Sequence, residues 1–283
     1  MRAVAFAPGH VTGLFSIAED GQGSTGAGFC VEKGVRTTVS AKPAKANRAR
    51  ITLNGAIERL PTSHEVVKRF LELAGKPHDI SVAHIAQLPV GYGFGMSGAG
   101  ALSLALALNK ALKTRLTTLE AARIAHEAEI ECGTGLGSVV AERLGGFGVR
   151  KEPADFENYV RIRFPRNLKV VLAPIKPIET RKIIRDAGWK GRINGIGSAC
   201  VRDLFAKPTA EYFMSLSRMF ATESGLAYNH LLGAMRESGG SMAMLGESIF
   251  VLTESPKKSA AILRKFSKNV VITKISMKGA RLL

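Results

Sequence analysis

Residues 88–109 read LPVGYGFGMSGAGALSLALALN and carry no charged side chain. The first half is rich in glycine, and the second half consists mainly of Ala and Leu, which are strong helix formers. We therefore expect a glycine-rich loop that runs into the N-terminus of a buried helix. Such a terminus offers backbone N–H groups and the positive end of a helix dipole to an anion, most often a phosphate. Ser97 lies where the loop becomes the helix, so its hydroxyl can cap the helix or bind a metal ion held by the phosphates.

Other interpretations of this stretch are a membrane span, a flexible hinge and a tight turn without a ligand. The glycines of the first half, with Pro89 before them, argue against a continuous helix that faces lipid. The spacing is not that of a Walker A motif, because no Lys-Ser or Lys-Thr pair follows. It also lacks the Gly-x-Gly-x-x-Gly pattern of a dinucleotide-binding loop. Glycine spacing alone therefore leaves the ligand open.

The composition of the chain limits its class and its partners. Its 283 residues, 46% of them hydrophobic, suffice for one large domain or two smaller ones. A net charge of +17 favours anionic partners, such as nucleic acid or a multiply phosphorylated small molecule. Because the basic residues are spread along the chain, we expect a solvated basic surface. Three distant cysteines and a short apolar N-terminus favour a reduced, cytoplasmic protein without a signal peptide.

Two more glycine-rich loops lie in the first half of the chain, at residues 19–28 and 132–138. The first carries Ser24 and Thr25, short polar groups that suit a small polar ligand. The second separates two expected helices. Three such loops together suggest a cavity in which the backbone comes close to a ligand.

The helix expected at 117–130 begins with a Thr-Thr pair and a capping glutamate. Its end carries a small acidic cluster around one imidazole: His126, Glu127, Glu129 and Glu131. Glu127 shares a helix face with Arg123, so the pattern alone favours a solvated face with charge pairs one turn apart.

Strand and helix patterns mix along the chain without a strict βαβ rhythm, which favours an α+β fold. We expect two domains, residues 1–165 and 166–283, because the character of the sequence changes between them. A first short strand is expected at 2–7, ending before a proline. The last residues, 276–283, are expected to form a frayed basic tail.

Three segments resemble, in order, the motifs of the GHMP kinases (galacto-, homoserine, mevalonate and phosphomevalonate kinases). They are APGHVTGLF at 7–15, PVGYGFGMSGA at 89–99 and GGSMAMLGESIF at 239–250. Within the family, His10 after Pro-Gly and the Gly-Ser-Thr-Gly-Ala-Gly loop at 23–28 are most similar to the archaeal pantoate kinases.

The resemblance implies ATP-dependent phosphorylation of the primary hydroxyl of pantoate to 4-phosphopantoate, on the archaeal route to coenzyme A. It implies an N-terminal nucleotide-binding domain, a ferredoxin-like C-terminal domain and an active site between them. It also implies Mg²⁺ as the metal cofactor. Members of the family are often dimers, so a homodimer is compatible with the resemblance.

The resemblance also suggests which residues bind ATP and Mg²⁺. Relatives hold Mg²⁺ between the second Ser of the central motif and a Glu on a later helix. We match these to Ser97 and Glu127 as the catalytic and metal-binding pair, with Glu129 and Glu131 as alternatives. The ATP phosphates would lie on the loop residues Gly91, Gly93, Gly95, Met96, Ser97, Gly98 and Ala99.

Two positions depart from the family pattern. Met96 replaces the first Ser of the central pair, so a ligand contact there must come from the backbone. Ser138 falls where mevalonate-type relatives carry an aspartate base, and a serine cannot replace an aspartate unaided. Homoserine kinase-type relatives lack such a base, so we expect direct transfer aided by Mg²⁺.

For the substrate, Thr180 and Arg181 resemble a Thr…Arg segment with which homoserine kinase-type relatives bind a carboxylate. The alternative is that Arg181 caps its helix or pairs with Glu179. The candidates for binding the pantoate hydroxyls are His10, Ser24 and Thr25.

Two rival functions remain at this stage. Another GHMP-type kinase, acting on homoserine or a mevalonate-like alcohol, would share nearly every motif. A basic nucleic-acid-binding protein would account for the net charge but not for the three glycine-rich loops.

Overall fold

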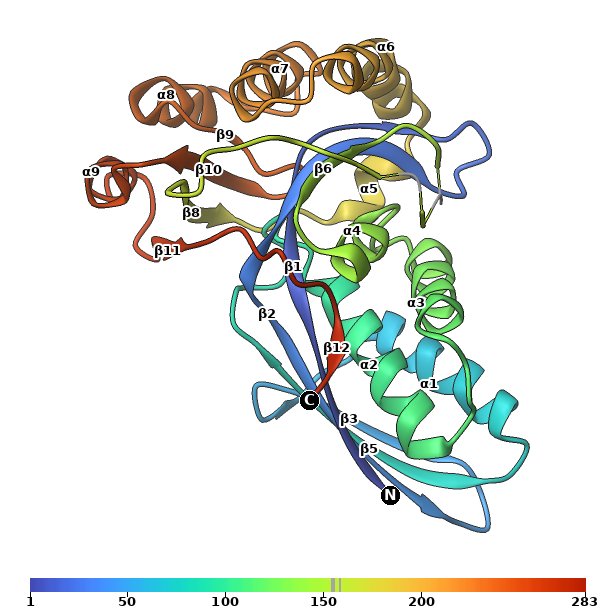
Figure 1. The fold of residues 1–283 in the computed structure, drawn as a ribbon. Coiled ribbons are helices and arrows are strands. Elements are labelled where there is room, and N and C mark those ends of the chain that lie inside the picture. Colours follow the sequence, from blue (N-terminus) through green and yellow to red (C-terminus); the bar gives the residue numbers. More distant parts are fainter. Residues whose placement is uncertain (154–155, 158) are drawn as a thin grey trace.

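The structure is a computed structural model that describes residues 1–153, 156–157 and 159–283. In this part of the chain, helices pack on two β-sheets in the expected α+β architecture (Figure 1). The larger sheet has the strand order β12-β1-β2-β5-β3-β4, and β6 and β7 extend it from β2. Its strands are β1 (Arg2–Ile17), β2 (Ser24–Pro43), β3 (Arg48–Leu53), β4 (Ala56–Ile57), β5 (His78–Ala86), β6 (Phe147–Arg150), β7 (Tyr159–Arg161) and β12 (Arg281–Leu282).

β1 continues through the proline at which we expected it to end, so that expectation is wrong. β1 pairs antiparallel with β2, and the register shifts between Pro8 and Gly9. A shift of this kind lets a strand continue past a residue that has no N–H to donate. As a result His10 lies inside β1, where its N–H donates to the carbonyl oxygen of Phe94 (3.0 Å) in the loop before α2.

Four helices follow the first strands: α1 (Pro61–Ala74), α2 (Met96–Leu112), α3 (Thr118–Cys132) and α4 (Ser138–Leu144). α2 packs directly on β1 and β2, and α1 and α3 pack against α2 (Figure 1). Every residue from 98 to 108 is buried, which accounts for the lack of charge in this stretch. Among the described residues, no helix has the length and apolar character needed to cross a membrane. The capping box of Thr117 and Glu120 is present at the start of α3.

The second sheet is antiparallel and has the order β11-β8-β10-β9. Its strands are β8 (Lys169–Lys176), β9 (Ser241–Met242), β10 (Glu247–Thr253) and β11 (Val271–Thr273). In chain order these are the fourth, first, third and second strands, as expected for a ferredoxin-like domain. Its helices are α5 (Thr180–Ile184), α6 (Ala187–Ala206), α7 (Ala210–Glu223), α8 (Asn229–Ser238) and α9 (Pro256–Leu263).

The end of the chain is ordered, so the expectation of a frayed tail is wrong. The N–H of Ser276 donates to the carbonyl oxygen of Cys30 (2.8 Å), and that of Ala280 to the carbonyl oxygen of Glu142 (2.9 Å). β12 then pairs antiparallel with β1 at the edge of the large sheet (Figure 1). The partners of this segment are backbone groups far away in sequence, which local composition does not reveal.

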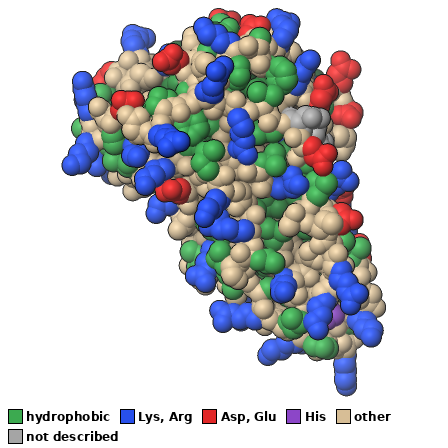
Figure 2. Space-filling view, in the orientation of Figure 1, with side chains coloured by type: hydrophobic (Ala, Val, Ile, Leu, Met, Phe, Trp, Pro, Cys, Tyr) green, Lys and Arg blue, Asp and Glu red, His purple; other side chains and the backbone are tan. Residues whose placement is uncertain are grey.

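The basic side chains are scattered over the visible face of the molecule. Figure 2 shows Lys and Arg spread over the sides of both sheets, with no continuous stripe on this face. On this face the arrangement agrees with a solvated basic surface better than with a dedicated nucleic-acid track.

Candidate functional site

A cavity of about 490 Å³, a size that suits a small ligand, collects most of the residues that the sequence singles out. Its lining comes from the glycine-rich loops before α2 and α4, from β1 and β2, from the start of α5 and from the turn before β10. Residues 24–28, which we expected in a glycine-rich loop, are the first residues of β2, so that expectation is wrong for them. Of the predicted site residues it brings together His10, Ser24, Thr25, Gly91, Gly93, Gly95, Met96, Ser97, Thr180 and Arg181.

The loop before α2 presents a helix N-terminus to this cavity. Gly91, Gly93 and Gly95 have φ angles of 87°, 77° and 69°, in the left-handed region that favours glycine. No side chain caps α2, so the N–H groups of its first turn are available to an anion. Gly98 and Ala99 lie in this first turn, behind the cavity wall and buried.

The same loop contacts the turn before β10 through the backbone. A Cβ atom on Gly246 would lie 2.0 Å from the carbonyl carbon of Tyr92 and 2.3 Å from the nitrogen of Gly93. Ahead of α5, the N–H of Ile178 donates to the carbonyl oxygen of Gly91 (2.9 Å). These contacts fix the second sheet's connections against the loop of α2.

Met96, the departure from the family pattern, has a packing role. Its side chain is buried, and its Cε atom lies 2.5 Å from the position that a Cβ atom would take on Gly9. The methionine therefore fills the space beneath β1 where this strand has no side chain. Only the backbone of Met96 remains for a phosphate.

Glu129 is an acidic residue of α3 that the structure brings to this helix N-terminus. It is 1% exposed, and its Oε1 accepts a hydrogen bond from the Thr134 hydroxyl (3.2 Å), which also lies 2.8 Å from the Thr62 hydroxyl. Its Oε2 has no hydrogen-bond partner of good geometry among the described residues. Burial raises the pKa of Glu129 to about 7, and the hydroxyls of Ser97 and Thr134 oppose this rise by hydrogen bonding to the charged form.

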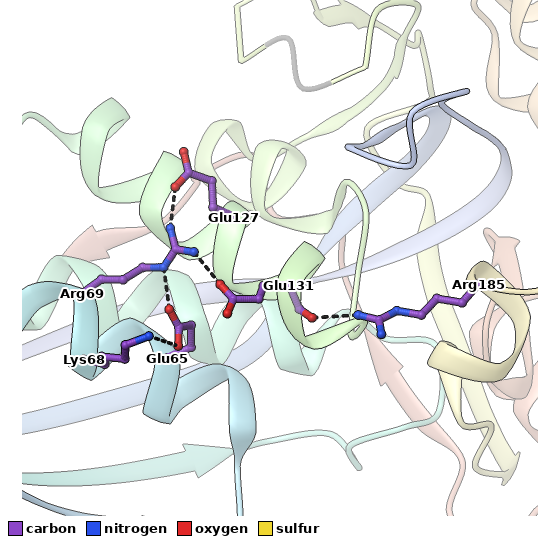
Figure 3. A network of polar contacts seen from close by, with 6 residues as sticks. All are labelled: Glu65, Lys68, Arg69, Glu127, Glu131 and Arg185. Atoms are coloured by element: carbon purple, nitrogen blue, oxygen red, sulfur yellow. Dashed lines mark hydrogen bonds and ion pairs between the residues drawn. The ribbon is translucent and has the colours of Figure 1, made fainter.

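Glu127 and Glu131 lie on another face of α3 and are exposed, whereas Glu129 is buried. The Glu127 side chain is 58% exposed and pairs with Arg69 of α1 (2.6 Å). Arg69 also binds Glu131 (2.7 Å) and Glu65 (2.9 Å), so the four side chains form one network between α1 and α3 (Figure 3). The structure therefore gives Glu127 a surface ion pair and does not bring it to Ser97.

α4 carries Ser138 at its first residue, where the side chain lines the cavity. One turn later on the same helix, Glu142 is fully buried, and neither of its carboxyl oxygens has a hydrogen-bond partner among the described residues. Burial, and then the charge of Glu129, raise the pKa of Glu142 well above its ordinary value. Nothing in the sequence pattern singled out this second buried carboxyl.

Arg150, at the end of β6, is a cavity residue that sequence reasoning missed. It is buried, and its guanidinium donates to the carbonyl oxygens of Ser24 (2.6 Å) and Gly137 (3.3 Å). It thereby fixes two of the glycine-rich loops and adds a positive charge to the wall. Its signal in the sequence is weak, because an arginine at the end of a short alternating strand is usually exposed.

His10 faces the cavity as a neutral imidazole. Burial lowers its pKa to about 3, and the nearby charge of Arg150 adds to this effect. Its Nδ1 lies 3.3 Å from the Thr12 hydroxyl. At neutral pH the side chain therefore offers a hydrogen bond but no positive charge.

Thr180 and Arg181 reach the cavity from α5. Glu179 pairs with Lys182 (2.7 Å), so the alternative pairing of Arg181 with Glu179 is not formed. The stem of Arg181 packs close to Gly133 in the third glycine-rich loop. Arg185 secures α5 by donating to the carbonyl oxygen of Glu131 at the end of α3 (2.7 Å; Figure 3).

Comparisons with known proteins agree with this geometry. A family model described as the GHMP kinases N-terminal domain matches residues 61–146. A pantoate kinase of Methanocaldococcus jannaschii is 32% identical over 278 residues, which cover 95% of this chain and 99% of the relative. A pantoate kinase of Methanospirillum hungatei is 31% identical, over 96% of this chain and 93% of the relative. A solved structure described as a phosphotransferase related to the CoA biosynthesis pathway is 28% identical and superimposes with a TM-score of 0.87, covering 100% of this chain and 99% of that one.

Proposed function

Since the chain belongs to the GHMP kinase family, we propose that it transfers a phosphoryl group from ATP to the primary hydroxyl of pantoate. The product would be 4-phosphopantoate, on the archaeal route to coenzyme A. The observation that carries the proposal is the meeting, in one cavity, of an uncapped helix N-terminus, the Ser97 hydroxyl and two guanidinium groups. Relatives of nearly the same length that are named pantoate kinase support this choice of acceptor.

In this proposal the ATP phosphates bind the N-terminus of α2 and the backbone of the loop before it. Phosphoryl transfer needs positioning and charge neutralisation more than covalent chemistry. Left-handed glycines and a free first turn of a helix supply both without a lysine.

The side chains around Ser97 fit Mg²⁺. Ser97 and Glu129 supply oxygen donors, and the Oε2 of Glu129 is a buried atom in need of a partner. Among the described residues no group of three or more His, Cys, Asp or Glu could hold a metal, which agrees with an ion that takes few protein ligands and binds phosphate. When bound, the ion would neutralise charge on the transferred phosphoryl group. We therefore propose Ser97 and Glu129 as its ligands, in place of Ser97 and Glu127.

The pantoate carboxylate would bind a guanidinium group. Arg181 is the first candidate, because no ion pair of the described residues occupies it. Arg150 would keep the β1–β2 hairpin and the loop at Gly137 in place beside it. Hydrogen bonds to the pantoate hydroxyls would come from the remaining polar residues of the wall: His10, Ser24, Thr25 and Thr180.

We also propose a division of the chain into two domains. We assign ATP binding chiefly to residues 1–165 and keep 166–283 as the second domain, with its last strand returning to β1. We also propose a cytoplasmic location, and sedimentation velocity would test the homodimer expected from the family.

A substrate panel tests the proposal. Purified protein is given ATP, Mg²⁺ and one of three alcohols (pantoate, homoserine or mevalonate), and ADP release is measured. We expect kcat/KM for pantoate to exceed the other two by at least about tenfold, because unmatched polar groups in the site would penalise the wrong alcohol. Phosphorus NMR would locate the phosphate on the primary hydroxyl. A higher kcat/KM for homoserine or mevalonate would refute pantoate as the substrate, and no turnover of any of the three would refute the function.

A further inference from the structure

Glu142 is the buried carboxyl that the proposed reaction does not use. It is 0% exposed, yet neither Oε1 nor Oε2 has a hydrogen-bond partner among the described residues. Buried carboxyl groups are normally paired, hydrogen-bonded or bound to a metal ion, since an unpartnered one is costly. The described residues therefore leave both oxygens of this side chain open to a proton, a water molecule or a ligand.

The orphaned oxygens of Glu142 point at the first turn of α2. A Cβ atom on Gly95 would lie 2.6 Å from Oε1, and one on Gly98 would lie 2.8 Å from Oε2. The same position at Gly98 is 3.0 Å from Oε2 of Glu129, the other orphaned carboxyl oxygen. The carboxyl groups of Glu129 in α3 and Glu142 in α4 therefore lie around one point beside Gly98, and any larger residue at position 98 would fill that point with its side chain.

Two carboxylates this close repel each other unless a proton or a cation lies between them. Mg²⁺ typically takes one or two carboxylates together with substrate phosphates. The N-terminus of α2, where the phosphates are proposed to bind, lies beside both glutamates. The position of a Cβ atom on Gly98 also lies 3.1 Å from the Cβ atom of Ser138, so the first turn of α4 packs against the same point.

We propose that Glu142 is a third ligand of the Mg²⁺ ion held by Ser97 and Glu129. The inference rests on the proposed function, because it takes the ion to be that of the ATP complex. It adds a second carboxylate to the metal site of this chain and accounts for three otherwise orphaned buried oxygens: both of Glu142 and Oε2 of Glu129.

Metal binding without nucleotide gives a direct test. Mn²⁺ is titrated into the protein, and the free ion is measured from its EPR signal. Glu142→Gln keeps the size of the side chain and removes one charged ligand, so we expect a dissociation constant at least about tenfold higher, as for Glu129→Gln. Glu127→Gln, on the exposed face of α3, is the matched control and should stay within about twofold. Wild-type affinity in Glu142→Gln, together with a loss in Glu129→Gln, would overturn the inference.

Thermal unfolding separates ligation from a purely structural role. Without metal, Glu142→Gln should melt at or above the wild-type temperature, because it removes one of two repelling carboxyls. Mg²⁺ should then raise the melting temperature of the wild type more than that of the variant. A structural glutamate would give the opposite result, a lower melting temperature without metal and an unchanged increment with Mg²⁺. Glu142→Met, which cannot bind Mg²⁺, should also lose the increment.

Turnover by the wild type distinguishes a failure of the Glu142 inference from a failure of the proposed kinase function. If the wild type phosphorylates pantoate while Glu142→Gln keeps wild-type Mn²⁺ affinity, the inference alone fails. If the wild type phosphorylates none of the three alcohols, the proposed function fails whatever the Mn²⁺ titration shows. In the active enzyme, Glu142→Gln should raise the Mg²⁺ concentration needed for half-maximal rate by about tenfold and leave the pantoate KM within about twofold.

Discussion

Replacing Gly246 by alanine should disable the site without unfolding the chain. The new Cβ atom would lie 2.0 Å from the carbonyl carbon of Tyr92 and 2.3 Å from the nitrogen of Gly93, and both of these neighbours are backbone atoms. Carbon atoms rest about 3.5 Å apart, so the two loops would have to separate by more than about 1 Å. Gly93 belongs to the loop proposed to hold the ATP phosphates, so the displacement would move this loop directly.

The size of the effect follows from that displacement. A misplacement of about 1 Å costs on the order of 100-fold in rate, which corresponds to about 2.7 kcal/mol of transition-state stabilisation. Overpacking at a rigid contact costs about 1–3 kcal/mol in the free energy of unfolding. We therefore expect kcat/KM to fall about 100-fold in Gly246→Ala, while urea denaturation still shows a cooperative transition.

Gly233→Ala is the matched control. Gly233 lies in α8, and a Cβ atom there would have no atom of another segment within 4 Å. Alanine in a helix interior is favoured over glycine by about 1 kcal/mol, so this variant should be more stable and equally active. If Gly246→Ala kept kcat/KM within about twofold of wild type, the reasoning from loop contact would be refuted.

Three further predictions concern single side chains. Burial lowers the pKa of His84 to about 4, whereas in the unfolded chain it is about 6.5, so acid protonates the unfolded chain first. The contribution of His84 to the free energy of unfolding should be intact above pH 6.5 and fall by about 3 kcal/mol between pH 6.5 and 4, and urea titrations of His84→Gln should show a shallower fall than those of the wild type. Arg181→Ala should raise the pantoate KM about tenfold or more and leave the ATP KM within about twofold; equal increases in steady-state kinetics would count against the carboxylate assignment. Ser138→Ala should keep kcat within about threefold, since a serine is no general base; a loss as large as that of Glu129→Ala would contradict transfer without a base.

The loop and helix of residues 88–109 could be predicted because their signal is local. Glycines that adopt positive φ angles are followed by residues with high helix propensity. Both signals depend only on residues a few positions apart in the sequence. The capping box at Thr117 was readable for the same reason. The mixed strand and helix patterns predicted the α+β class, and the resemblance of three motifs to the family implied the ferredoxin-like second domain, which no single segment encodes.

The structure places Glu127 on the exposed side of α3, for a reason of helical phase. Glu127 shares a face with Arg123 and Glu131, and that face pairs with Arg69 in solvent. Glu129 lies one turn after the buried Ala125, so it continues the apolar side of α3 into the core. Treating the alanines of this helix as its buried stripe predicts from the sequence that Glu129 is the buried glutamate of the three.

Other features depend on contacts that no local pattern encodes. The order of the C-terminal residues comes from hydrogen bonds to Cys30 and Glu142, and the placement of Arg150 comes from the pairing of β6 with β2. Each of these partners lies more than a hundred residues away along the chain. A pattern within one segment cannot predict them, because the free energy that orders the segment comes from its distant partners.

The loop before α2 contacts two connections of the second sheet through backbone atoms. The loop that presents the N-terminus of α2 is fastened at Gly91 to the connection before α5, and at Gly93 to the turn before β10. α5 also carries Arg181, the proposed carboxylate ligand. A movement of α5 toward a bound acid would therefore act on the phosphate loop through the backbone of Ile178, without any side chain between them. We therefore expect substitutions of Ile178 to alter the KM values of both substrates, whereas Arg181→Ala leaves this backbone contact in place and should alter chiefly the pantoate KM.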